Sequence, residues 1–234
     1  VSLKPDFSLD MGAFLDRMAA CNPAIVFLSV PNNPTGNVFA EEDVLRIINR
    51  APGLVVIDEA YNPFAQVTWL HRLCEFPNVV LLRTVSKLGL AGIRLGYAVG
   101  GHDWIGEFDK VRSPYNVSVL TQCAAEFILG SHDILDRQAT EIRASREALI
   151  PALASIPGVR VFPSVANFIL VRVADAAGLV AALKAHGILI KSVHGAHPLL
   201  ENCVRITVGT PDENAKLLSA FRDIVGGHPR DRVV

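Results

Sequence analysis

The amino-acid sequence predicts an α/β fold in which a large domain with a mostly parallel sheet precedes a small α+β domain. In the first half of the chain, short β-branched runs alternate with helical patterns, as in strands joined by crossover helices. After Pro157-Gly158 the pattern changes to short strands separated by one helical stretch. Half of the 234 residues are apolar, which is enough for the core of one large or two smaller domains.

Strands and helices of the large domain follow from local patterns. Its apolar runs predict strands at 24–30, 54–58, 79–84 and 94–99. A helix is expected to begin near Ala40, because the acidic residues that follow favour the positive end of a helix dipole. Helical patterns also cover 103–112, 117–129 and a long stretch that Ser131 can cap.

The small domain is expected to contain four strands and two helices. The strands are predicted at 159–162, 167–172, 188–191 and 203–208, and the helices at 176–186 and 212–225. We therefore divide the chain into a partial large domain at 1–130, a connecting helix at 131–156, a small domain at 157–226 and a disordered tail at 227–234.

Composition excludes several functions. The formal net charge of -1 gives no electrostatic case for a nucleic-acid partner or an anionic membrane. No apolar run approaches the ~20 residues that span a bilayer. The four cysteines are widely spaced, which favours reduced thiols in the cytoplasm. His194 and His197 lie in a loop without a nearby acidic residue, so we expect no metal.

Two motifs follow the first two predicted strands. Residues 31–36 read Pro-Asn-Asn-Pro-Thr-Gly, which by themselves favour a simple turn. Asp58 ends the second strand, and it could either cap a following helix or hold a pyridine nitrogen in its protonated form. Tyr61 could donate to a phenolic oxygen of the same ring.

Two further motifs lie after the third predicted strand and at the start of the fourth. Lys87 follows the third strand, where most lysines are solvated, although a desolvated amine becomes a nucleophile for a carbonyl. Arg94 is either an ordinary charge at a strand edge or a bidentate ligand of a phosphate. The neighbouring glycines do not form the G-x-G-x-x-G motif of dinucleotide-binding proteins.

In this order and spacing, the four motifs resemble those of the fold-type I pyridoxal-phosphate aminotransferases, and the resemblance covers about residues 1 to 225. It implies a pyridoxal 5'-phosphate cofactor and a homodimer. Lys87 would bond covalently to the cofactor, and Asp58 would pair with the pyridine nitrogen. The remaining cofactor contacts would be made to the phenolic oxygen by Asn33 and Tyr61, and to the phosphate by Ser86 and Arg94.

Other segments are typical of the histidinol-phosphate aminotransferases within this family. These segments are residues 110–116 (with Tyr115), residues 166–171 (with Asn167) and residues 197–214 (with Arg205). The resemblance implies a reaction of histidine biosynthesis, in which an amino group is exchanged between glutamate and imidazole-acetol phosphate. The reverse reaction takes histidinol phosphate and 2-oxoglutarate as its substrates. Arg205 would bind the substrate anion, unless it forms a structural ion pair. Lys191 stands where many members have a second arginine.

Family members carry a further segment of ~100 residues, a small domain in size, before the point where this chain begins. We therefore expect an N-terminally truncated form that is weakly active or inactive by itself. Three alternatives stay open. They are another enzyme of the same fold, such as an aromatic amino acid aminotransferase or a threonine-phosphate decarboxylase, a non-catalytic aminotransferase-like module, and, more remotely, a nucleotide-dependent dehydrogenase.

Overall fold

The computed structural model describes residues 1–226, so the predicted tail at 227–234 lies outside the described residues. The chain forms two compact units. The first contains Val1–Asn33 and Asn37–Ala139, and the second contains Pro34–Gly36 and the described residues from Thr140 onward. The change of unit at Ala139 falls inside the long predicted helix, and the domain limits at 130 and 156 stay a prediction.

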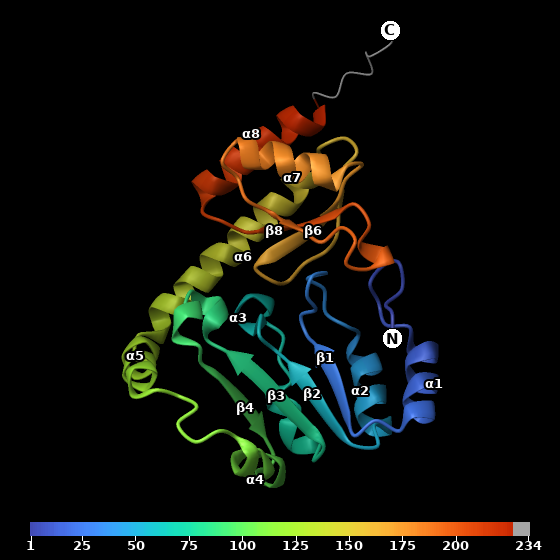
Figure 1. Ribbon diagram of the computed structural model, residues 1–234, viewed down its shortest axis with the longest axis vertical. Helices are drawn as coiled ribbons and strands as arrows, with labels where there is room; N and C mark the ends of the chain where they lie inside the picture. Colours follow the sequence, from blue (N-terminus) through green and yellow to red (C-terminus); the bar gives the residue numbers. More distant parts are fainter. Residues whose placement is uncertain (227–234) are drawn as a thin grey trace. The chain divides into compact units, whose positions relative to one another are not determined.

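The first unit is built on a four-stranded sheet whose strands follow one another in chain order (Figure 1). The strands are β1 (Ile25–Ser29), β2 (Leu54–Asp58), β3 (Val79–Thr84) and β4 (Gly96–Gly100). The pairs β1–β2 and β2–β3 are parallel, and β3–β4 is antiparallel. The mostly parallel sheet is therefore confirmed, with each strand within two residues of its predicted bounds.

Helices cover both faces of this sheet because successive side chains of a strand point to opposite faces. Val55 and Ile57 pack against α1 (Met11–Cys21) and α2 (Glu41–Arg50). Leu54 and Val56 face the opposite way and pack near α4 (His102–Val111). Helix α2 begins after Ala40 with three acidic residues, as predicted, whereas α1 was missed.

The remaining elements of the first unit are mostly short. They are α3 (Asn62–Ala65), α5 (Val119–Leu129) and the 3-10 helices η1 (Leu70–Glu75), η2 (Ser86–Leu88) and η3 (Ala91–Ile93). Helix α6 (His132–Ala154) begins in this unit and continues into the second. No helix within residues 1–226 is long and apolar enough to cross a membrane.

The second unit contains an antiparallel sheet with the strand order β5-β6-β8-β7. Its elements are β5 (Arg160–Val161), β6 (Phe168–Arg172), α7 (Ala176–Ala185), β7 (Lys191–Ser192), η4 (Pro198–Leu200), β8 (Cys203–Thr207) and α8 (Pro211–Gly226). Phe221 of α8 and Leu153 of α6 are fully buried against the sheet. The strand predicted at 188–191 forms only from Lys191, because Ile188 and Ile190 pack on the core without joining the ladder.

Candidate active site

The carboxyl ends of β1, β2 and β3 bring three of the predicted motifs to one edge of the sheet. Ser29 lies opposite Asp58 in the parallel register, and Asp58 lies opposite Leu82. The register continues past the strands, since the Val30 amide donates to the Asp58 carbonyl at 2.9 Å. The segments that follow the three strands therefore all begin at this edge of the sheet. Open α/β sheets bind ligands at the same edge.

Asp58 and Tyr61 are held by the turn that follows β2. Asp58 is partly exposed, and its Oδ1 accepts from the Ala60 amide at 2.8 Å. The carboxylate therefore fixes the turn but does not cap the following helix, whose N-terminal cap is Tyr61 without a side-chain hydrogen bond. Its capacity for further acceptor bonds leaves the interpretation as a partner of a pyridine nitrogen open. Tyr61 is 8% exposed and lies at the N-terminal cap of α3.

Lys87 lies against Tyr61. Its Nζ is 5.3 Å from the centroid of the Tyr61 ring, within the range of a cation–π contact. Lys87 belongs to the short helix η2 and is partly buried, so it differs from the solvated lysine that its sequence position alone allows. The structure therefore brings together two predicted cofactor residues that follow different strands.

Ser86 and Arg94 belong to two segments that are joined by hydrogen bonds. The Leu95 carbonyl accepts from Thr84 Oγ1 at 2.9 Å and from the Val85 amide at 3.2 Å. These bonds place the residue before Leu95 beside the start of η2. Arg94 is exposed and has a left-handed backbone, with φ of 58°. An exposed guanidinium at this place is accessible to an anion.

Asn33 lies in the turn after β1, which the Asn32 amide closes by donating to the Asn37 carbonyl at 2.8 Å. Asn33 is exposed and is the last residue of the first unit before the short segment Pro34–Gly36, which belongs to the second unit. Gly36 ends that segment with a φ of 79°, and a Cβ at this position would lie 2.4 Å from Ser164 Oγ. Only glycine fits this turn without a shift of its neighbour.

Arg205, Lys191 and Asn167 lie in the second unit. Arg205 and Lys191 are direct partners in the antiparallel pairing of β8 with β7. The Arg205 guanidinium lies 5.0 Å from the centroid of the Phe168 ring, which orients it. Like charges directly opposite each other are unfavourable, so this pair suits an anion that bridges them. Asn167 precedes β6, and its carbonyl accepts from the Val208 amide at 2.9 Å.

Tyr115 belongs to the first unit. It lies between α4 and α5, and its side chain is 97% exposed. The structure of the first unit does not place Tyr115 beside the residues at the sheet edge, and the role of Tyr115 in substrate binding stays a prediction.

Sequence reasoning missed a buried ion pair beside the site. Glu59, the neighbour of Asp58, has a fully buried side chain whose Oε2 lies 2.7 Å from Arg83 Nη2. Arg83 follows four apolar residues in strand β3, and a charge in such a strand is a signal that a buried partner exists.

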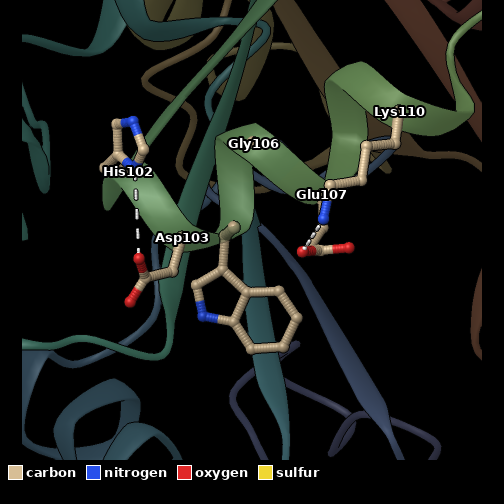
Figure 2. Close-up of a pocket in the computed structure, with 6 residues that line it drawn as sticks. His102, Asp103, Gly106, Glu107 and Lys110 are labelled. Carbon is tan, nitrogen blue, oxygen red and sulfur yellow. Dashed lines mark hydrogen bonds and ion pairs between the residues drawn. The ribbon is translucent and has the colours of Figure 1, made fainter.

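Two surface pockets have linings that contain none of the predicted site residues. One, of about 430 Å³, runs along α4 and is lined by residues from His102 to Lys110 (Figure 2). Lys110 pairs with Glu107 there, and His102 Nδ1 lies 3.9 Å from Asp103 Oδ1. Another, of about 470 Å³, lies beside α8 and is lined by both apolar and polar side chains, among them Leu217 and Glu213. Residues 1–226 contain no cluster of histidine, cysteine, aspartate or glutamate that could hold a metal ion.

Comparison with known proteins identifies the family. The model of the family described as aminotransferase class I and II matches residues 1–221. A histidinol-phosphate aminotransferase of Burkholderia pseudomallei is 57% identical over 223 residues, which are 95% of this chain and 63% of that relative. The chain therefore belongs to the class I and II aminotransferases, and it spans 63% of the length of this curated relative.

Solved structures agree with this family and define its fold. The histidinol-phosphate aminotransferase of Sinorhizobium meliloti, solved with pyridoxal 5'-phosphate, has a TM-score of 0.85 and 30% identity, over 98% of this chain and 64% of that chain. A threonine-phosphate decarboxylase of Porphyromonas gingivalis has a TM-score of 0.76 and 28% identity, over 86% and 64% of the two chains. The chain has the fold of the fold-type I pyridoxal-phosphate transferases, as predicted.

Proposed function

We propose that the whole protein is a pyridoxal-phosphate-dependent histidinol-phosphate aminotransferase, which exchanges an amino group between glutamate and imidazole-acetol phosphate. One observation carries the catalytic part of this proposal: the Lys87 amine lies 5.3 Å from the Tyr61 ring, at the sheet edge where Asp58 ends β2. The relatives named above support the substrate.

The residues at this edge fit the cofactor. When bound, pyridoxal phosphate withdraws electrons from the bond to the substrate α-carbon that is broken. The partly buried Lys87 amine would hold the cofactor covalently and could also move the α-proton of the substrate. Asp58 would face the pyridine nitrogen, where a carboxylate favours the protonated form. Asn33 and Tyr61 would contact the phenolic oxygen, and Ser86 and Arg94 would hold the phosphate.

The second unit supplies groups that suit anionic substrates. Histidinol phosphate carries a phosphate dianion, whereas glutamate carries carboxylates, so one pocket must accept different anions. Arg205 provides a planar fork for bidentate binding, and Lys191 beside it provides a point charge that tolerates either anion. Substrate-binding roles are proposed for Asn167 and for Tyr115 as well.

The protein is further proposed to act in the cytoplasm as a homodimer. All four cysteines are free thiols, which agrees with a reducing compartment. Leu120 and Phe127 of α5 are 83% and 80% exposed, and exposed large apolar side chains are characteristic of surfaces that become covered. Sedimentation of the whole protein measures the oligomeric state, and a monomer at micromolar concentration contradicts the dimer.

The substrate is tested by steady-state kinetics with glutamate as the amino donor. We expect turnover with imidazole-acetol phosphate and a much smaller kcat/KM with phenylpyruvate. Activity on phenylpyruvate alone contradicts the assignment and favours an aromatic aminotransferase. Release of carbon dioxide from threonine phosphate favours the decarboxylase instead, a function carried by one of the structural relatives.

Arg205→Ala is expected to raise the KM for both anionic substrates by about 10- to 100-fold, because a charge-assisted hydrogen bond contributes about 1.5–3 kcal/mol. Arg160→Ala is a matched control, since Arg160 belongs to the same sheet and also lies over a phenylalanine ring, at 4.8 Å from the Phe162 centroid. An unchanged KM in the first variant places the substrate anion elsewhere.

A further inference from the structure

The ion pair between Glu59 and Arg83 joins the two segments that carry the proposed cofactor residues. Glu59 directly follows β2, and Arg83 lies on β3. Arg83 Nε and Nη2 both donate to Glu59 Oε2, at 3.0 Å and 2.7 Å. The side chain of Glu59 is fully buried and that of Arg83 is 17% exposed. The pair is therefore a buried link between neighbouring strands.

Further hydrogen bonds complete the surroundings of the carboxylate. Thr68 Oγ1 lies 3.0 Å and 2.9 Å from the two carboxylate oxygens of Glu59, and the Trp69 amide donates to Oε1 at 2.6 Å. Arg83 Nη2 also donates to Thr68 Oγ1 at 2.7 Å. A buried charge is tolerated when it is paired and hydrogen-bonded, and these bonds tie Glu59 to Thr68 and Trp69 at the other end of the segment 59–69.

The location of this pair relative to the site has a direct consequence. Glu59 stands between Asp58 and Tyr61 in the chain, and its amide donates to the Leu82 carbonyl at 2.8 Å. Arg83 lies between Leu82 and the segment that leads to Lys87. Any shift of the pair therefore moves the Asp58–Tyr61 turn relative to the helix that carries Lys87.

The charges of the pair also bear on Asp58. Burial lowers the pKa of Arg83, but the hydrogen bonds and negative charge of Glu59, together with a smaller contribution from Tyr97, outweigh this effect and leave the pKa above its ordinary value. Arg83 is therefore a permanent cation. It neutralises the carboxylate of Glu59, so that Asp58 does not adjoin an unpaired negative charge.

We propose that Glu59 and Arg83 are positioning residues, which set the distance between the Asp58–Tyr61 turn and Lys87 so that both meet one cofactor molecule. This inference rests on the proposed function, since it concerns the same site. Neither residue touches the cofactor in this scheme; the pair acts through the main chain of the two segments that it joins.

The test compares Glu59→Gln with wild type in the whole protein. The substitution keeps the size of the side chain and removes its charge, so the link to Arg83 weakens. We expect kcat to fall by about 100-fold, because small displacements of reacting groups have effects of that order. KM for glutamate should change less, and the dissociation constant for pyridoxal phosphate, measured by titration of the apoprotein, should rise.

Glu75→Gln is the matched control, because Glu75 also pairs with an arginine, at 2.7 Å from Arg72 Nη2, but on the exposed surface. It should leave kcat and cofactor binding unchanged. A purely structural role of Glu59 predicts a lower free energy of unfolding with normal kcat and normal cofactor affinity in the folded protein. That result overturns the inference.

A second variant and a second measurement complete the test. If Glu59→Gln does not fold, Glu59→Asp retains the charge but shortens the side chain, and we expect kcat to fall by at least about tenfold; a normal kcat overturns the inference. Borohydride reduction of the wild type distinguishes failure of the proposed function from failure of the positioning role. If no adduct forms at Lys87, the proposed function fails as well, whereas an adduct with unaffected variants removes only the positioning role.

Discussion

Replacement of Lys87 by alanine is expected to abolish covalent attachment of pyridoxal phosphate and to lower turnover by at least about 10⁴-fold. The structure places this amine in a partly buried position, 5.3 Å from the Tyr61 ring centroid. The variant lacks both the nucleophile for the cofactor aldehyde and the base for the α-proton. Because these roles follow one another on the same atom, no neighbouring group replaces them.

The measurement for Lys87→Ala is the mass of the protein after reduction with borohydride, together with its absorbance near the visible range. Lys110→Ala is the control, since Lys110 is an exposed lysine of α4 that pairs with Glu107. Wild type and control should gain one cofactor mass, on the peptide that contains Lys87. An adduct that persists in Lys87→Ala, with turnover retained, contradicts the assignment, and absence of any adduct in the wild type favours a non-catalytic module.

Replacement of Asp58 by alanine is the second large effect. We expect covalent attachment at Lys87 to persist, because the amine is intact, whereas the rate of proton abstraction falls by about 10²–10⁴-fold. The reason is electrostatic. Without a carboxylate beside it, the pyridine nitrogen loses its proton, and the cofactor no longer stabilises the charge that develops at the α-carbon.

Asp58→Asn separates this charge from the structural role of the side chain. The amide oxygen of asparagine can still accept from the Ala60 amide, the bond that Asp58 Oδ1 makes at 2.8 Å, so the turn is preserved. We expect Asp58→Asn to be nearly as slow as Asp58→Ala in single-turnover kinetics. A near-normal rate in Asp58→Asn means that Asp58 only caps the turn.

The sequence alone predicted the parallel strands because each is a short apolar run with its own turn signals. The motifs after β1, β2 and β3 were therefore expected at one edge, and the register of Ser29, Asp58 and Leu82 agrees. Helix α1 was missed because half-buried helices in a segment without a strong periodic pattern lack a local signal. Strand β7 is shorter than predicted because apolar side chains can pack on a core without joining a ladder.

The sequence by itself thus determined which reactive groups follow which strands. They are the amine of Lys87 after one strand, the carboxylate of Asp58 at the end of another, and Arg94 in a third segment. Only the tertiary structure decided that Lys87 faces the Tyr61 ring and that Glu59 pairs with Arg83. These contacts depend on the register between β2 and β3, which residues distant in sequence set together. A pattern within one segment carries no information about the side chain that will lie opposite it in the neighbouring strand.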